Sequence, residues 1–459
     1  CTRRHRDAGR KSAVEEKKRT MIGISGMVLL MLCFLSIVDQ TERKEPEPLQ
    51  ISMDDALKDY DYLWKVLEED YSFKYLAERR YGLSMEAVKA DFRRQIETLG
   101  TDQVDFYEYY RRLRNCIGLF QGLGHLKLYS PAEYASYRRE MELVMQTEES
   151  GISPLNQYSF ELLTDPEVEE RYRWLMEQEA GETEKSGTAA VSNRRKGTSN
   201  TSNLILHELN DKVAYMKINS FLTSSMQPGE AEEIENWFLD HADTPYIILD
   251  ICGNSGGNDW YWINFLVAPN LDSELGYSHY QITPYGEETE RLFQLNGIFK
   301  EDLDSDLDQI RQLPEYQEEA LQEVSYLRNI RISVMPSREE KLCRGTFFLL
   351  TDSQTGSAAD GFAIFCKATG FATVVGQNTY GDGGGGGVFL LKLPESGLLL
   401  RFRAWHNLNP DGSSNVEFGT APDILNVKSP SGGKPNLEAC LEYIERLETG
   451  MEKPVVKSE

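Results

Sequence analysis

The sequence lacks the cysteine patterns of metal-binding and disulfide-linked proteins. Its 459 residues include seven cysteines, and none of them forms a CxxC pair or a Cys/His cluster. Five cysteines follow residue 38. Because disulfides join cysteines in pairs, an odd number argues against a complete disulfide framework. Several stand in apolar strand or helix patterns, so we interpret them as small core residues. We expect no metal, no cofactor and no disulfide scaffold.

Two classes of partner are disfavoured by what the sequence lacks. The formal net charge is −25, and residues 1–20 carry +5 of charge while all other residues carry −30. The basic surface that nucleic acid requires is therefore missing from the folded part. The glycine run at 383–387 lacks the Gly-Lys-Ser/Thr ending of a phosphate-binding loop, so we expect no nucleotide either.

Long apolar runs are also rare, and one stands near the N-terminus. Residues 21–38, MIGISGMVLLMLCFLSIV, carry no charge and follow the basic residues Lys17, Lys18 and Arg19. This length and flank are typical of a membrane-spanning helix or a long signal peptide. No small-x-small cleavage site follows, so we expect an uncleaved single-pass anchor in the cell membrane, with the folded domains that follow it extracytoplasmic. Cys33 has bulky neighbours, which makes lipidation the weaker alternative.

The spacing of apolar residues divides the rest of the chain. From residue 53 to about 119 they recur every three or four positions, which predicts a small helical domain. The stretch from 130 to 205 is charged and becomes low in complexity. We predict these segments: basic tail 1–20, anchor or signal 21–38, tether 41–52, helical domain 53–128, polar insertion or linker 129–204, core 205–430, and C-terminal helix and tail 431–459.

Strands and helices alternate in the predicted core. The strands are KVAYMKI, YIILDI, GTFFLLT and FATVVG, and the helices between them are PGEAEEIENWFLDH, DWYWINFLVA and SAADGFAIFCKAT. This order predicts an α/β fold with a mostly parallel sheet and crossover helices. GVFLLKL and LLLRFRA, joined by PESG, predict an added hairpin.

Two corners of this sheet could carry chemistry, because functional groups gather where strands end and helices begin. One corner is Gly356-Ser357-Ala358, and the other is the segment DICGNSGG at 250–257. Serine at a helix start is often only an N-cap, which contributes about 1 kcal/mol. Its small neighbours also leave the hydroxyl open to a substrate and the next amide open to an oxyanion. The glycines of GNSGG could supply a second donor, or form a plain turn.

A serine nucleophile needs a general base. The chain has six histidines, at positions 5, 125, 207, 241, 279 and 406. His125 stands in GLGHLKLYS between glycine-bearing turns and a short strand, and His406 ends a strand in AWHNLNPDG. Most histidines in proteins are structural, so these settings alone favour no single base.

At this point the residues suggest a family. YIILDICGNSGG, TGSAADGFAIFCKATGFATVVGQNTYGDG and VEFGTAPDI resemble, in order and spacing, the core blocks of the S41 serine peptidases, which include tail-specific, C-terminal processing and tricorn-core proteases. VAYMKINSF and GLGHLKL are similar to two further blocks. The resemblance spans about residues 105–128 and 205–430, and it implies a ClpP/crotonase-like core and a serine-type endopeptidase that acts on peptides or proteins.

The resemblance also implies roles for residues. Ser357 falls at the family's nucleophile, and the amide of Ala358 with that of Gly256 or Gly257 would form the oxyanion hole. One branch of the family uses a lysine base in a TYGKG-like segment, but this chain has Asp382 there, and a carboxylate cannot replace a desolvated lysine.

The histidine branch of the family fits better. His125 matches its base, and the orienting acid should come late in the chain, where Glu417 is the best match and Asp423 the rival. In this arrangement Ser357 attacks, His125 takes its proton, and the acid fixes the tautomer of the ring.

Two departures from the family keep alternatives open. Residues 130–205 lack the carboxylate-binding loop of a PDZ module, so we predict no PDZ, and Cys252 replaces a common basic residue. One alternative is a catalytically inactive S41-fold protein that binds a peptide or an apolar ligand at the membrane. Another is an anchored interaction protein that binds peptides without cutting them.

Overall fold

The computed structural model describes most of the chain beyond residue 47. The described residues are 48–147, 152–186, 202–222, 226, 228–385, 387–426, 433–453 and 455. The predicted basic tail 1–20 and the apolar segment 21–38 lie outside them. Among the helices in these ranges, none combines the length and the apolar character needed to cross a membrane. Leu49–Glu459 is one compact unit.

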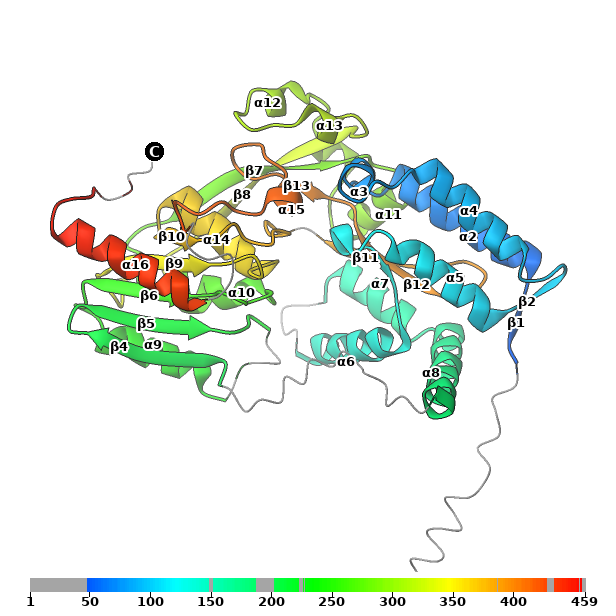
Figure 1. Cartoon of the computed structure of the whole chain (residues 1–459), viewed down its shortest axis with the longest axis horizontal. Coiled ribbons are helices and arrows are strands. Elements are labelled where there is room, and N and C mark those ends of the chain that lie inside the picture. Colours follow the sequence, from blue (N-terminus) through cyan, green and yellow to red (C-terminus); the bar gives the residue numbers. More distant parts are fainter. Residues whose placement is uncertain are drawn as a thin grey trace, which may run out of the picture. The chain divides into compact units, whose positions relative to one another are not determined.

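A six-stranded sheet forms the predicted α/β core (Figure 1). Its order is β14 (Ile424–Leu425), β10 (Ala372–Gly376), β9 (Thr346–Thr351), β6 (Tyr246–Asp250), β5 (Val213–Ile218) and β4 (Leu204–Asn210). The first five run parallel to their neighbours, and only β4 is antiparallel to β5. The prediction of a mostly parallel sheet is therefore confirmed, and so are its four named strands.

Helices cover both faces of this sheet, as the near-continuous apolar strands require. α9 (Glu230–Asp240), α10 (Asp259–Tyr261) with the π-helix η3 (Trp262–Val267), and α14 (Ala358–Thr369) pack on one face with Ile247 and Leu249. α16 (Gly433–Glu448) packs on the other face with Ile248 and Phe348, and Figure 1 shows it crossing the sheet. The alternation of Ile247, Ile248 and Leu249 between two cores follows from the two-residue period of a strand.

The N-terminal part of the described chain is helical, as its apolar spacing predicts. Its helices are α2 (Met53–Glu69), α3 (Lys74–Tyr81), α4 (Met85–Glu97) and α5 (Phe106–Gly118), with β1 (Gln50–Ser52) paired to β2 (Gln103–Asp105). Ser52 caps α2 by accepting from the amide of Asp55. These helices share one hydrophobic core with the predicted hairpin, β11 (Val388–Lys392) and β12 (Leu399–Arg403).

Three helices form in the stretch that its charge suggested was an insertion or linker. They are α6 (Pro131–Thr147), α7 (Pro154–Leu163) and α8 (Pro166–Ser186). Tyr172 of α8 stacks on Tyr134 of α6 with ring centroids 4.4 Å apart, and both rings are buried. Aromatic residues spaced along charged helices therefore give this stretch a packed inner face.

Two strands of another sheet, β7 (Leu275–Thr283) and β8 (Tyr326–Val334), lie between the core strands β6 and β9 in the sequence. This sheet pairs β7 with β8 and with the short β13 (His406–Asn407), all antiparallel. The short helices η4 (Ala268–Asn270), α11 (Glu287–Leu295), η5 (Lys300–Asp302), α12 (Asp308–Arg311) and α13 (Glu318–Leu321) belong to the same stretch, and α15 (Asn415–Phe418) precedes β14. The sequence analysis did not predict these elements.

Candidate active site

Ser357 occupies the corner between β9 and α14. It is the N-cap residue of α14, but its backbone is in an uncommon conformation, with φ 53° and ψ −126°. Among the described residues its side chain makes no capping hydrogen bond. The N-cap explanation of this serine therefore does not account for its hydroxyl. A non-glycine residue at positive φ costs about 1–3 kcal/mol and is often found at functional sites.

The glycine-rich loop after β6 packs directly against this corner. A Cβ on Gly256 would lie 2.7 Å from the Cβ of Ser357 and 2.9 Å from the amide nitrogen of Ala358. Gly256 also has φ 102°, a conformation that side chains rarely adopt. The loop is tied to the corner by the amide of Gly356, which donates to the carbonyl of Asn254 at 3.1 Å. Only glycine fits at position 256, for reasons of both space and conformation.

The amides of this corner suit an oxyanion hole. Ala358 is the first residue of α14, so its N–H has no acceptor within the helix. Gly257 forms a parallel β-bridge with Phe221. Two hydrogen bonds make this bridge: the amide of Phe221 donates to the carbonyl of Gly256, and the amide of Asn258 donates to the carbonyl of Phe221. Neither of these bonds uses the N–H of Gly257. The amide of Gly256 already donates to Oδ1 of Asn254 at 2.9 Å, so Ala358 and Gly257 are the two predicted donors that remain for an oxyanion.

His125 is held by a tight turn at the end of the N-terminal helical segment. It ends the short helix η1 (Leu123–His125) with φ 58°. A Cβ on the preceding residue, Gly124, would lie 2.3 Å from the Phe73 ring, so this position also requires glycine. The following strand β3 (Lys127–Leu128) pairs with β12, which brings His125 beside Arg403 at the end of that strand.

His125 contacts a carboxylate that the sequence analysis did not assign to it. Its Nε2 lies 2.7 Å from Oδ2 of Asp382, and Nη2 of Arg403 lies 3.2 Å from the same nitrogen. Arg403 also donates from Nη1 to Oδ1 of Asp382. The three side chains form one cluster at the ends of η1, β12 and the TYGDG segment.

The pKa of each member of the cluster reflects the others. Burial lowers the pKa of His125; Asp382 opposes this effect, Arg403 and Arg401 add to it, and the pKa stays below its usual value. Burial alone would raise the pKa of Asp382, but Arg403, His125 and Arg401 outweigh it and hold that pKa below its usual value. At neutral pH the imidazole is therefore neutral and the carboxylate ionised, as general-base chemistry requires.

Asp382 links this cluster to Ser357. The preceding residue, Gly381, forms a parallel bridge with Gly356, and its carbonyl accepts the amide of Ser357 at 3.0 Å. Residues 381 and 382 thus connect Ser357 with His125, although these two residues are far apart in the sequence. The only signal of this connection in the sequence is that Asp382 stands between the glycines of TYGDG.

Asp360 fixes the loop that carries Asp382. This buried carboxylate accepts hydrogen bonds from the amide of Gly383, the hydroxyls of Thr379 and Thr420, and the side-chain amide of Asn415. Its burial raises its pKa, and these donors oppose that effect. Asp360 stands one turn into α14, so one side chain joins the helix of Ser357 to the loop of Asp382.

The two acids predicted as partners of His125 have other contacts. Glu417 in α15 forms an ion pair with Arg79 of α3. Asp423 accepts the amide of Val374 at 2.9 Å at the edge of the sheet. The other histidines also have other settings, since His406 is fully buried with its Nε2 2.8 Å from Oγ of Ser414. The orienting role of Glu417 or Asp423 stays a prediction.

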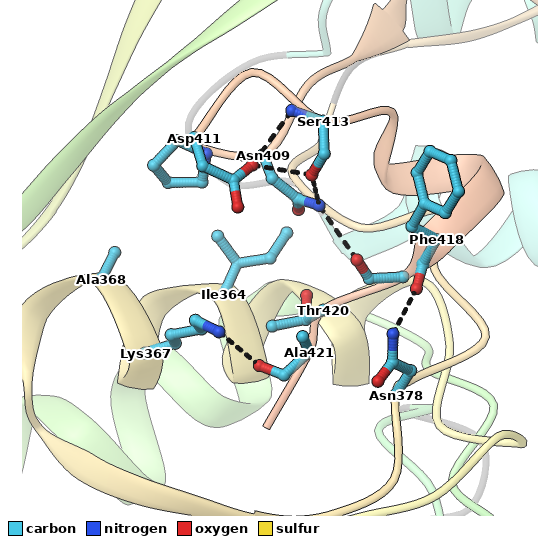
Figure 2. Close-up of a pocket in the computed structure, with 12 residues that line it drawn as sticks. Ile364, Lys367, Ala368, Asn378, Asn409, Asp411, Ser413, Phe418, Thr420 and Ala421 are labelled. Atoms are coloured by element: carbon cyan, nitrogen blue, oxygen red, sulfur yellow. Dashed lines mark hydrogen bonds between the residues drawn. The ribbon is translucent and has the colours of Figure 1, made fainter. Parts of the chain in front are cut away.

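A cavity of about 210 Å³ opens beside α15 (Figure 2). Its apolar wall includes Ile364 and Ala368 of α14 with Phe418, and Lys367 closes one side by donating to the carbonyl of Ala421. Asn378, just before the TYGDG segment, donates to the carbonyl of Phe418. The cavity therefore neighbours the segment that borders Ser357, but Ser357, His125 and Asp382 do not line it.

The cysteines of the described ranges are buried core residues. Cys116, Cys252, Cys343, Cys366 and Cys440 are all buried, and no disulfide joins them. No group of three histidine, cysteine or carboxylate side chains in these ranges is arranged to hold a metal ion. The interpretation of the five cysteines as core residues is confirmed.

Comparison with known proteins agrees with this geometry. The family model of peptidase family S41 matches residues 212–425. Among curated proteins, none matches the sequence of this chain. The chain is similar in structure to mature CPAF, with a TM-score of 0.52 and 13% identity over 88% of this chain and 99% of that one. It is similar also to a candidate peptidase from Parabacteroides merdae, with a TM-score of 0.50 and 15% identity over 88% of this chain and all of that one.

These solved structures show a shared fold, and the family model covers the strands, the loop and the corner around Ser357. The five sequence blocks occur in the expected order; four of them lie on the six-stranded sheet, and GLGHLKL ends in β3 of the sheet that β11 and β12 form. Residues 212–425 are therefore identified as a core of peptidase family S41.

Proposed function

We propose that the protein is a serine-type peptidase in which Ser357 is the nucleophile and His125 the general base. The observation that carries the proposal is the corner itself: a serine at φ 53° whose hydroxyl does not cap its helix, packed against a glycine loop. The helix has no use for this hydroxyl, and the strained backbone has no structural purpose that the contacts reveal. The match of residues 212–425 to a peptidase family supplies the reaction class.

The reaction follows from the groups at the corner. Ser357 Oγ attacks the carbonyl carbon of a peptide bond and its proton passes to His125, whose pKa below the usual value keeps it unprotonated at neutral pH. The amides of Ala358 and Gly257 bind the oxygen that becomes negative, because the amide of Gly256 already donates to Asn254. His125 then protonates the leaving amine, and water releases the acyl group. The proposal holds whichever carboxylate orients His125.

Cleavage of an unfolded protein substrate tests this function. The full chain should cut a denatured substrate into peptides, and Ser357→Ala should lose at least about 10³-fold in rate. Ser353→Ala is the matched control, because Ser353 is exposed in the turn that precedes the corner and should keep the wild-type rate. If the folded wild type cuts nothing, the alternative of an inactive S41-fold binding protein is favoured.

The location of the protein is a second proposal that rests on sequence alone. The uncharged run 21–38 after a basic cluster supports a single-pass anchor in the cell membrane, with the core outside the cytoplasm. Fractionation tests it: the full chain should sediment with membranes and resist carbonate extraction, and a chain starting at residue 48 should not.

A further inference from the structure

The strongest unexplained feature is the contact between His125 and Asp382. Asp382 stands where one branch of the family carries its lysine base, and a carboxylate there has no role in that branch's mechanism. In this chain its Oδ2 lies 2.7 Å from Nε2 of His125, and both side chains are largely shielded, with exposed fractions of 12% and 24%.

The contact fixes which ring nitrogen of His125 carries the proton. An ionised carboxylate only accepts, so Nε2 must donate its hydrogen to Asp382. Arg403 has only donors, so its approach to the same nitrogen at 3.2 Å is an electrostatic contact and not a hydrogen bond. Nδ1 is then unprotonated, and it is the nitrogen left to accept a proton from Ser357.

Arg403 keeps Asp382 in place and ionised. The guanidinium binds Oδ1 and, at 3.3 Å, the main-chain carbonyl of Asp382, which leaves Oδ2 for His125. Arg403 is buried, with a side-chain exposure of 5%. The two oxygens of one carboxylate therefore serve two partners, an anchoring arginine and the base.

The backbone on both sides of Asp382 is fixed to the catalytic corner. Gly381 accepts the amide of Ser357, and the amide of Gly383 donates to Asp360 at 3.0 Å and to Asn415 at 2.9 Å. The alternative acid, Glu417, is engaged with Arg79 in a different element. Both chain neighbours of Asp382 therefore bond to the Ser357 corner or its helix, whereas the carboxylate of Glu417 pairs with Arg79.

We propose that Asp382 is the acid that orients His125, so that the nucleophile, base and acid are Ser357, His125 and Asp382. This inference rests on the proposed function and names the third member of its site. In the attack, the Ser357 Oγ–H proton moves to Nδ1 as the Oγ–C bond forms and the carbonyl pair becomes the oxyanion. The proton leaves Nδ1 for the amine when the C–N bond breaks, and Asp382 stays ionised throughout, so it acts as a positioning residue.

The rate at which a fluorophosphonate labels Ser357, measured against pH, tests the assignment. Asp382→Asn suits the test, because Asp382 has φ 70° and asparagine tolerates this conformation. The plateau rate should fall about 10²–10⁴-fold, because the amide no longer fixes the tautomer. The acid limb should move to lower pH, since Asp382 raises the pKa of His125 while Arg403 and Arg401 lower it. Glu417→Gln tests the rival acid: if Asp382 orients His125, the labelling rate of this variant should stay within about threefold of the wild type, at an unchanged limb.

A second variant guards against misfolding. Asp382→Asn leaves the buried Arg403 without its carboxylate, so the double variant Asp382→Asn/Arg403→Gln removes both charges. Circular dichroism and a thermal melt establish that each variant is folded. A folded variant of either kind that labels at the wild-type rate, or a large loss in Glu417→Gln, would overturn the proposal.

The wild-type protein alone gives an independent reading. The ¹⁵N shifts of the His125 ring, assigned by comparison with His125→Gln, should show the Nε2–H tautomer above the acid limb. The Nδ1–H tautomer would overturn the proposal without any variant at the acid. A wild type that shows the Nε2–H tautomer but never labels would leave Asp382 paired to His125 and refute the peptidase function instead.

Discussion

Replacing Gly256 by alanine tests the close packing of the glycine loop against Ser357. A Cβ at this position would lie 2.7 Å from both the Gly356 carbonyl oxygen and the Ser357 Cβ, and 2.9 Å from the Ala358 nitrogen. Ordinary van der Waals contact begins near 3.4 Å. The corner would therefore have to move by about 0.7 Å, and displacements of this order at a reacting group can cost 10²-fold in rate.

The expected magnitudes separate an effect on catalysis from an effect on stability. The positive φ costs an alanine about 1–2 kcal/mol of unfolding free energy, and the overpacked contact adds about 1–3 kcal/mol. Displacing an oxyanion donor costs a further 10²–10³-fold in the rate of acylation, about 2.7–4 kcal/mol. We expect Gly256→Ala to remain folded at low temperature and to label slowly with a fluorophosphonate.

Gly253→Ala is the matched control in the same loop. Gly253 also has a positive φ, of 79°, but an added Cβ would meet nothing within 4 Å. This variant should lose only the conformational part of the stability and keep the wild-type labelling rate. Urea titration gives the two stabilities, and labelling at a fixed reagent concentration gives the rates. Equal labelling rates for Gly256→Ala and the wild type would refute the packing argument.

Two further predictions concern the groups around the site. Burial lowers the pKa of His406 to about 3 and that of His279 to about 4, so both rings take up protons when the protein unfolds below pH 6.5. The free energy of unfolding should therefore fall as the pH drops, by roughly 2 kcal/mol per histidine at pH 5. Urea titrations at pH 7 and pH 5 measure this loss, and equal stabilities would contradict it. Asp360→Asn should lower the free energy of unfolding by at least about 2 kcal/mol, because four donors lose a carboxylate acceptor. The variant should also lose most of its fluorophosphonate labelling. Calorimetry and labelling measure these effects, and an unchanged melting temperature would contradict the role of Asp360 in fixing the loop of Asp382.

Local pattern was sufficient to predict the core of the fold. Runs such as YIILDI and GTFFLLT are apolar at consecutive central positions because both faces of their strands are buried, and the structure places them in the centre of the sheet. Helical spacing likewise predicted α2, α4 and α5. In contrast, β7 and β8 were not predicted: a long acidic stretch at 284–325 separates them, so no short turn marks them as a hairpin.

The chemistry of the site was only partly readable from the sequence. Ser357 and the glycines of GNSGG stand at strand ends, so their meeting follows from the topology of a parallel sheet. The contact of His125 with Asp382 and Arg403 joins η1, a loop and β12, and no local pattern relates these segments. From the sequence, Asp382 indicated only that the lysine base of one family branch is absent. In the structure its carboxylate contacts His125.

The most direct test of the central claim is the site of covalent modification by a fluorophosphonate. The account predicts that the full chain, folded and at neutral pH, gains the mass of one adduct, that peptide mapping places it on Ser357, and that Ser357→Ala gains none. A folded protein that gains no adduct, or that carries the adduct on another serine, would contradict the claim that Ser357 is the nucleophile.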